Sequence, residues 1–194
     1  MNARIGPANS MTQGEMERIV TKCLDKLFRK DLPLLQNDVS ERAITHKLAE
    51  YLQDRFPELN VDCEYNRNFE LGPGASKILN VLRDEWQTRI RAGSEMEEDD
   101  LLAISTYPDI IVHRRLTNTE NLLVIEVKKR NSKVGHNHDH KKLAVFTDTS
   151  DQNMYHYKYG VFVLLETGVE EPQKQELTWF VEGHIETNIE RASS

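Results

Sequence analysis

Two stretches of the chain decide the fold that we expect: Tyr107-Pro108-Asp109-Ile110-Ile111-Val112 and Val124-Ile125-Glu126-Val127-Lys128. Each lies within an apolar run of strand length, over residues 109–115 and 121–128, and polar residues 117–119 separate the two runs. Apolar, β-branched runs on either side of a short polar turn are typical of a β-hairpin. Charged residues lie at the ends of both strands, where burial is costly unless the charge is compensated.

The hairpin geometry brings these charges together. A turn centred between residues 118 and 119 would pair Asp109 with Lys128 and Ile111 with Glu126. Because strand side chains alternate, all four positions would share one face, within roughly 5 Å of their cross-strand partners. Two carboxylates this close repel one another, and Mg²⁺, which prefers oxygen ligands, would relieve the repulsion. A cross-strand ion pair without metal is the alternative, and the spacing alone does not choose between them.

The rest of the chain alternates helical and strand patterns. Helices are expected over 15–29, from Ser40 to Pro57, over 77–91 and briefly around 143–146, and further strands over 61–69, 160–166 and 176–182, the last at a sheet edge. This predicts one α/β domain over 14–185, with a central mixed sheet of about four to five strands flanked by helices. Residues 71–106 form an insertion with an acidic run at 94–100, and residues 1–13 and 186–194 are expected to be flexible tails.

Composition excludes several classes of protein. The 194 residues are 38% hydrophobic and 29% charged, with a net charge of −7. The longest apolar runs are strand-sized, so no membrane span is expected. The first ten residues contain no apolar core of a secretory signal, and Cys23 and Cys63 lack a CxxC partner, so we expect a cytoplasmic protein with reduced thiols.

One segment of this acidic chain is basic. Residues 113–142 contain eight Lys or Arg and three Asp or Glu, which indicates a site that attracts an anion. We expect five of these residues to contact the phosphate backbone of a nucleic acid: Lys129, Arg130, Lys133, Lys141 and Lys142. Ordinary solubility charge is the alternative interpretation.

The spacing of the acidic residues also has a family counterpart. Pro108-Asp109, followed after sixteen residues by Glu126-Val127-Lys128, resembles the PD-(D/E)xK (restriction endonuclease-like) nuclease superfamily. Four further segments match in order: Ser40-Glu41-Arg42-Ala43-Ile44, Glu64-Tyr65-Asn66-Arg67, Asp139 to Leu143, and Tyr157 to Phe162. The resemblance covers roughly residues 38–166 and looks like that of a small single-domain member.

The resemblance implies a restriction endonuclease-like core and metal-dependent hydrolysis of phosphodiester bonds through a metal-bound water. It assigns Asp109 and Glu126 as ligands of Mg²⁺, with the carbonyl of Val127 as a backbone ligand. Lys128 would be the catalytic lysine, and Glu41 would be the helical acid that supports the metal through water. Mn²⁺ is expected to substitute for Mg²⁺.

Several functional questions stay open at this stage. We take DNA as the substrate, but the residues leave DNA and RNA, and duplex and single strand, undecided. A double-strand cut would require a homodimer, for which the sequence gives no clear interface. The insertion 71–106 is the chief departure from the family, and its acidic residues would repel a nucleic acid. The alternative function is a catalytically silent module on the same fold that binds nucleic acid or protein.

Three sets of His and Tyr residues have a structural interpretation beside a functional one. His136, His138 and His140 are expected in a mobile basic loop, which is favoured over a zinc or second-metal site. His113 is expected on the surface at a strand end. Tyr155, Tyr157 and Tyr159 could stack on unpaired bases or simply begin a half-buried strand.

Overall fold

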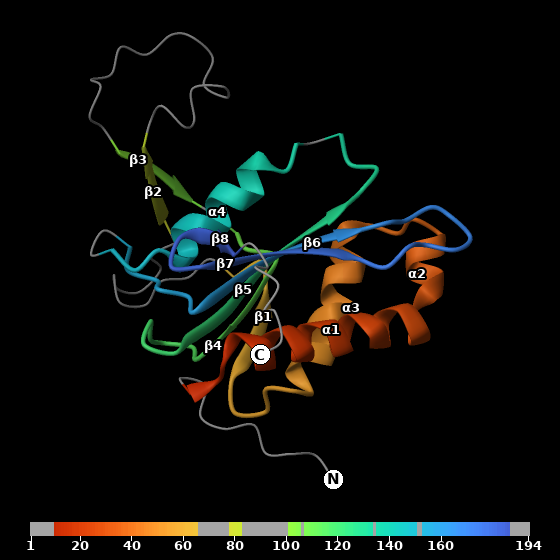
Figure 1. The fold of residues 1–194 in the computed structure, drawn as a ribbon, viewed down its shortest axis with the longest axis horizontal. Helices are drawn as coiled ribbons and strands as arrows, with labels where there is room; N and C mark the ends of the chain where they lie inside the picture. Colours follow the sequence, from red (N-terminus) through yellow and green to blue (C-terminus); the bar gives the residue numbers. More distant parts are fainter. Residues whose placement is uncertain are drawn as a thin grey trace, which may run out of the picture.

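The computed structural model describes residues 10–65, 78–82, 101–105, 107–133, 135–150 and 153–186. The helices are α1 (Gln13–Lys30), α2 (Leu32–Gln36), α3 (Glu41–Gln53) and α4 (Asn137–Thr147). The strands are β1 (Asn60–Cys63), β2 (Ile78–Leu82), β3 (Leu101–Ser105), β4 (Ile110–His113), β5 (Asn121–Lys129), β6 (Tyr159–Leu165), β7 (Glu176–Val181) and β8 (His184–Glu186). Figure 1 shows their arrangement.

Six strands form one mixed sheet in the order β1-β4-β5-β6-β7-β8, and β2 and β3 form a separate antiparallel pair. Among the strand pairs that the structure describes, only β5 and β6 run parallel, and α4 lies in the crossover between them, as a parallel connection requires. The predicted α/β architecture with a mixed sheet is therefore confirmed, with more strands than expected. Among the described residues, no helix has the length and apolar character needed to cross a membrane.

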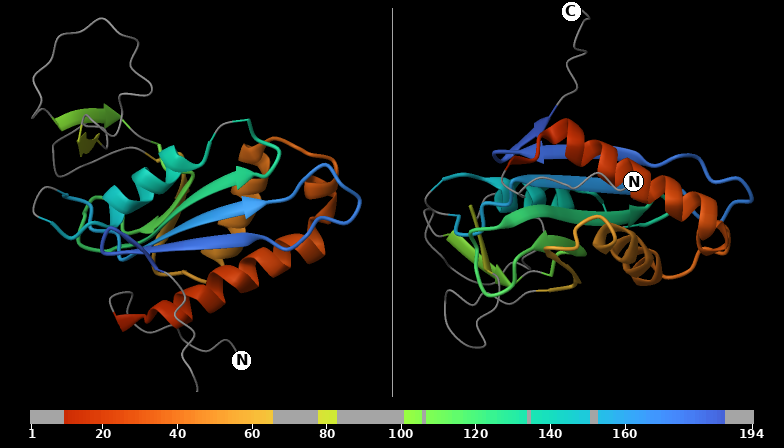
Figure 2. Two further views of the ribbon diagram at one scale, coloured as in Figure 1. Left: turned by 45° about the horizontal axis from the view of Figure 1, so that its top comes forward. Right: turned by 90° about the horizontal axis from the view of Figure 1, so that it is seen from below.

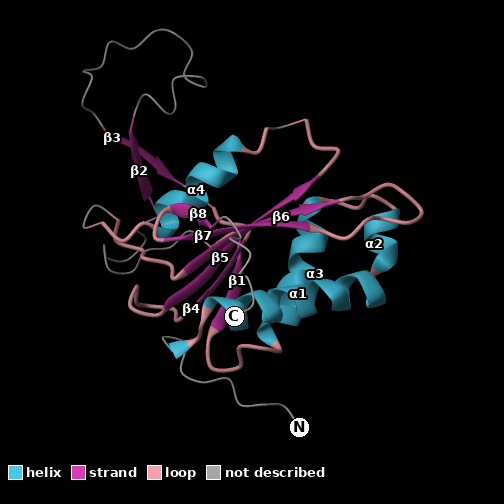
Figure 3. Ribbon diagram, in the orientation of Figure 1, coloured by secondary structure: helices cyan, strands magenta, loops and turns pink. Residues whose placement is uncertain are grey.

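Helices cover both faces of this sheet (Figures 2 and 3). Ile110, Ile125 and Val163 belong to the hydrophobic core shared with α1 and α3. Ile111, Val124 and Phe162, their neighbours along the strands, belong to a second core shared with α4. Burial of apolar side chains on both faces is the main force holding the layers together.

The N-terminus of α3 is placed by a helix cap. The hydroxyl of Ser40 accepts a hydrogen bond from the amide of Ala43, as the sequence predicted for a helix that begins here. The cap places Glu41 in the first turn, where the helix dipole favours a negative charge.

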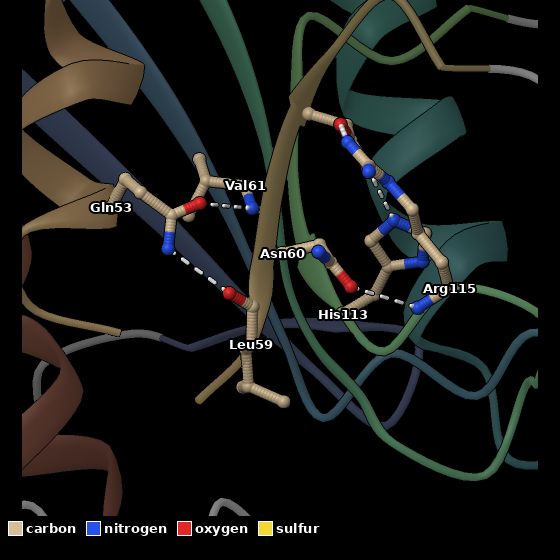
Figure 4. Close-up of polar contacts among 7 residues, drawn as sticks. Gln53, Leu59, Asn60, Val61, His113 and Arg115 are labelled. Carbon is tan, nitrogen blue, oxygen red and sulfur yellow. Dashed lines mark hydrogen bonds and ion pairs between the residues drawn. The ribbon is translucent and has the colours of Figure 1, made fainter. Parts of the chain in front are cut away.

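Edge strand β1 is tied to the end of α3 by one side chain (Figure 4). The amide nitrogen of Gln53 donates to the carbonyl of Leu59 at 3.0 Å. Its amide oxygen accepts the N–H of Val61 at 3.1 Å. A single glutamine therefore fixes where β1 starts relative to the helix.

A second set of polar contacts ties β1 to β4 and corrects one expectation. His113 is 3% exposed, with Nε2 3.0 Å from Oδ2 of Asp62 on β1. Arg115 also pairs with Asp62, and its backbone N–H donates to Asn60 at 3.2 Å (Figure 4). His113 is buried rather than on the surface because the neighbouring strand supplies a carboxylate partner. These ion pairs hold the pKa of Asp62 well below its usual range, although burial opposes them.

Some boundaries differ from those predicted. Residues 78–82 form β2, paired with β3, rather than the start of a helix over 77–91. Its apolar run fits a strand as well as a helix, and a pairing partner far along the chain decides between them. The strand expected over 61–69 ends at Cys63, and Glu64 adopts a positive φ of 49°. Strand β7 is not an edge, because β8 pairs with it. Residues 1–9, 66–77, 83–100 and 187–194 lie outside the described residues.

Candidate active site

Strands β4 and β5 form the predicted antiparallel hairpin in a register two residues away from the expected one. Ile110 lies opposite Ile125, so Asp109, one residue before β4, comes opposite Glu126 rather than Lys128. The side-chain faces are unchanged, because a shift of two residues preserves alternation. The two acids are therefore direct cross-strand neighbours, closer than the sequence predicted.

A β-bulge in β5 produces this register. At the turn end of the hairpin, His113 pairs with Asn121, and the register shifts between that pair and the next. Leu122 and Leu123 both enter the core on the α1 and α3 side, as expected where one strand carries an extra residue. If the pairing of His113 with Asn121 continued without the bulge, Asp109 would lie opposite Ile125, which belongs to that core. With the bulge, Asp109 lies opposite Glu126.

The carboxylate of Asp109 is held against the backbone of β5. Its Oδ2 accepts the N–H of Val127 at 2.7 Å. Burial raises the pKa of Asp109 to about 6, although the hydrogen bond from Val127 and the charge of Lys142 act in the opposite direction. Asp109 is thus fixed beside Glu126, in an environment that disfavours a second uncompensated negative charge.

Glu126 is almost completely buried, with 2% of its surface exposed. Its Oε1 lies 2.6 Å from Nζ of Lys142, but accepts no hydrogen bond of good geometry. Burial raises the pKa of Glu126 to about 8, and the charge of Lys142 only partly offsets this. The distance defines a close ion pair, so the ammonium of Lys142 already compensates this oxygen.

Lys128 lies between two carboxylates from different helices. Its Nζ is 3.4 Å from Oε1 of Glu41 on α3 and 3.6 Å from Oδ2 of Asp139 on α4. Burial acts to lower the pKa of Lys128, but the charges of Asp139, Glu41 and Asp109 raise it above its ordinary value. Lys128 is therefore an ammonium at neutral pH, suited to stabilise negative charge rather than to accept a proton.

Glu41 also contacts the backbone of β5. Its Oε2 accepts the N–H of Lys129 at 3.3 Å, while its Oε1 faces Lys128. The first turn of α3 is thereby anchored to the carboxyl end of β5. The sequence analysis assigned Glu41 to the site from family resemblance alone, and the structure brings it there.

Helix α4 adds two residues whose place in the site the sequence analysis missed. Asp139 is 4% exposed, and its Oδ2 has no hydrogen-bond partner of good geometry. Lys142, predicted to contact nucleic acid on the surface, instead has only 11% of its side chain exposed and pairs with Glu126. The prediction of a loop up to about residue 142 concealed that these residues share a helix face three positions apart.

Together, these six residues carry two more carboxylates than ammonium groups: Glu41, Asp109, Glu126 and Asp139 against Lys128 and Lys142. A divalent cation would balance that excess, and oxygen donors are the ligands that Mg²⁺ prefers. Oε1 of Glu126 and Oδ2 of Asp139 are buried oxygens without hydrogen bonds, which fits such an ion. Nonetheless, no three Asp, Glu, His or Cys side chains among the described residues are grouped closely enough to hold a metal. The carboxylate oxygens are therefore suitable ligands for Mg²⁺, but the ammonium groups of Lys128 and Lys142 lie among them.

The basic residues predicted to bind nucleic acid are mostly engaged elsewhere. Nζ of Lys129 lies 2.7 Å from Oδ1 of Asp38, and Arg130 lies 2.5 Å from Oε1 of Glu176. Lys133 is exposed, and Lys141 is partly exposed on α4. Their contact with nucleic acid stays a prediction, for which Lys133 is the best placed.

The histidines at 136–140 belong to the start of α4 rather than to a mobile loop. The rings of His136 and His140 pack against Phe162, with centroids 5.1 Å and 4.6 Å away. Burial lowers the pKa of His140. The His136 and His140 rings therefore contribute to the packing of α4 against the sheet.

The tyrosines that begin β6 are structural. Tyr155 and Tyr157 are each 1% exposed and pack edge-on against Phe146 of α4. Tyr159, at the start of β6, is also buried, and its hydroxyl donates to the carbonyl of Met11 at 3.0 Å. These positions leave no ring face for stacking on a base.

Comparison of the chain with protein-family models, with curated proteins and with solved structures finds no match. The resemblance to the PD-(D/E)xK nucleases therefore stays a prediction.

Proposed function

We propose that this protein is a divalent-metal-dependent nuclease that hydrolyses phosphodiester bonds, with DNA as the expected substrate. The observation that carries the proposal is the group of four carboxylates and two lysines around the end of β5, in which Glu126 and Asp139 are buried and the other four residues are partly buried. Burying an excess of like charge is costly unless a cation compensates it, so such a group is hard to explain as packing alone.

Asp109 and Glu126 would hold Mg²⁺, with the Val127 carbonyl as a further oxygen donor. When bound, Mg²⁺ supplies a Lewis acid that polarises a phosphoryl oxygen and lowers the pKa of water. The hydrogen bond from Val127 fixes one carboxylate in advance, at 2.7 Å. A prepositioned ligand reduces the ordering that binding would otherwise require.

Lys128 would stabilise the negative charge that develops on the phosphate. Its partners Glu41 and Asp139 keep it charged and approach it from two sides of the sheet end. A cation held in place before the reaction is more effective than one that must reorganise. Glu41 is on this view a positioning residue, since it contacts Lys128 and the backbone of Lys129.

Cleavage of supercoiled plasmid and of a labelled single-stranded oligonucleotide tests the proposal. We expect wild-type protein to nick DNA in Mg²⁺ or Mn²⁺ and not in EDTA. Lys128→Ala should slow cleavage by about 10²-fold or more, the usual effect of removing one charge-stabilising group. Asp109→Ala and Glu126→Ala should abolish it. Cleavage that survives all three substitutions would indicate a contaminating nuclease and refute the assignment.

A second candidate is a binding module without catalysis. The observation that favours it is that Lys128 and Lys142 already compensate part of the acidic charge, and no three-ligand group exists among the described residues. Such a module would bind nucleic acid equally well with and without Mg²⁺. Titration of Mg²⁺ by calorimetry separates the two, because only the enzyme requires a site that Asp109→Ala removes.

A further inference from the structure

We propose that Lys142 is an internal occupant of the metal site: its ammonium lies where a divalent cation would bind, and it leaves when the cation arrives. This inference rests on the proposed function, since it concerns the same carboxylates. It adds that, in the metal-free protein, the side chain of Lys142 occupies the position of the metal ion.

The position of Lys142 supports this role. Its Nζ is 2.6 Å from Oε1 of Glu126 and 3.9 Å from Oδ1 of Asp139, and its side chain is only 11% exposed. An ammonium this deeply buried has lost most of its water, and acidic partners are what make that burial tolerable. Lys142 therefore contacts the buried acids of the cluster rather than solvent.

The ammonium and a metal ion would compete for the same oxygen. Mg²⁺ binds a carboxylate oxygen at about 2.0–2.1 Å, so an ion on Oε1 of Glu126 would lie too close to Nζ of Lys142, which is 2.6 Å from the same oxygen, and two cations repel strongly in a buried site. Lys142 is held there mainly by its ion pair with Glu126, since Oδ1 of Asp139 lies 3.9 Å from Nζ. A charge held in this way is replaceable by another charge.

The same arrangement explains why no three-ligand group appears among the described residues. The acids of the cluster face lysines from β5 and α4 instead of a common centre. Removal of one lysine would leave Glu126 and Asp139 free to turn toward the ion. On this proposal, the described residues form no metal centre in advance because Lys142 still occupies the position of the ion.

Lys142→Gln tests the proposal with Mn²⁺ alone as the probe. The substitution keeps the side-chain length similar and removes the ammonium. If the state in which Lys142 has left Glu126 is a minor fraction of the wild-type protein, the apparent dissociation constant equals the intrinsic one divided by that fraction. We expect Lys142→Gln to bind Mn²⁺ about tenfold or more tightly than wild type in calorimetry. Lys174→Gln, which removes an exposed charge elsewhere, should leave the affinity unchanged.

A measurement on wild-type protein covers the case in which Lys142→Gln does not fold. Lysine labelled with ¹³C at Cε gives one methylene signal per residue, and Lys142→Arg identifies the signal of Lys142. Addition of Mg²⁺ should shift that signal saturably, with the dissociation constant found by calorimetry. Lys174 should show no shift.

The outcomes separate this inference from the proposed function. Metal binding with an unmoved Lys142 signal, or with equal affinity in Lys142→Gln, would overturn the inference and leave the metal site intact. Binding by Lys142→Gln but not by wild type would support the inference strongly. Failure of both proteins to bind Mn²⁺ would overturn the proposed function together with the inference.

Discussion

The backbone N–H of Val127 donates a 2.7 Å hydrogen bond to Oδ2 of Asp109, and this contact joins the two halves of the candidate site. Asp109 precedes β4, whereas Val127 lies between Glu126 and Lys128 on β5. In the observed register Asp109 lies opposite Glu126, and its carboxylate reaches the N–H of the next residue along β5. The register of the hairpin therefore determines where the proposed metal ligand Asp109 lies.

Asp109→Asn should separate the ligand role of Asp109 from its structural role. Asparagine retains an oxygen that accepts the N–H of Val127 but loses the negative charge. We expect Mn²⁺ affinity and cleavage to fall by about 10²-fold or more, with metal-free stability in urea preserved. Asp109→Ala should additionally lose about 1–3 kcal/mol, because the N–H of Val127 would lack its acceptor. Full activity in Asp109→Asn would rule out Asp109 as a metal ligand.

The side-chain faces of the hairpin could be predicted from sequence, but its register could not. Alternation is a local property, and it correctly placed Asp109 and Glu126 together. The bulge depends on how Leu122 and Leu123 both pack under α1 and α3, which is a tertiary effect. The predicted pairing differed from the observed one by two residues. Asp109 and Glu126 still share one face of the sheet, because a shift of two residues does not change the side to which a side chain points.

The partners of the basic residues could not be predicted for a similar reason. Asp38 and Glu176, which bind Lys129 and Arg130, are distant in the sequence and meet them only in the folded sheet. The part of α4 in the site was missed because its first turns are polar, so periodicity showed the helix only from Leu143 onward. The family resemblance matched Asp139 to Leu143 to a later helix, but it did not indicate that Asp139 and Lys142 contact Lys128 and Glu126.

The stability of the metal-free protein should fall as the pH rises. Burial raises the pKa of Glu126 to about 8 in the folded state, above its ordinary value of 4.5. Between these pH values the folded state binds more protons than the unfolded state, so increasing pH favours unfolding. We expect a loss on the order of 1 kcal/mol per pH unit relative to Glu126→Gln, which does not titrate. Urea unfolding in EDTA from pH 5 to pH 8 measures the free energy of unfolding of both proteins. Equal slopes of this free energy against pH in wild type and Glu126→Gln would contradict the prediction.

Lys133 should contribute more to nucleic-acid affinity than Lys129. Lys133 is exposed, whereas the ammonium of Lys129 is bound by Asp38 at 2.7 Å and faces the carbonyl of Val39 at 3.2 Å. We expect Lys133→Gln to weaken duplex binding and to reduce the slope of log affinity against log salt by about 1. Lys129→Gln should lower stability and leave the salt slope nearly unchanged. Fluorescence anisotropy in EDTA at several salt concentrations distinguishes them, and the reverse ranking would refute the assignment.

Gly160 should control how closely α4 approaches the sheet, and through it the placement of Asp139 and Lys142. A Cβ at Gly160 would lie 3.1 Å from Cγ2 of Thr147 and 3.2 Å from Cβ of Phe180. Because both neighbours are buried, the helix would have to move. We expect Gly160→Ala to cost about 1–3 kcal/mol in urea unfolding, as overpacking usually does.

Gly14→Ala is the matched control for this substitution, since Gly14 lies in α1 with no atom within 4 Å of its added Cβ. Alanine favours a helix over glycine, so this variant should be as stable as wild type or slightly more stable. Displacement of α4 in Gly160→Ala should also weaken the hold of Lys142 on Glu126, which calorimetry with Mn²⁺ would report as a changed affinity absent from Gly14→Ala. If Gly160→Ala matched Gly14→Ala in both stability and Mn²⁺ affinity, the packing of α4 would not be what positions its half of the site.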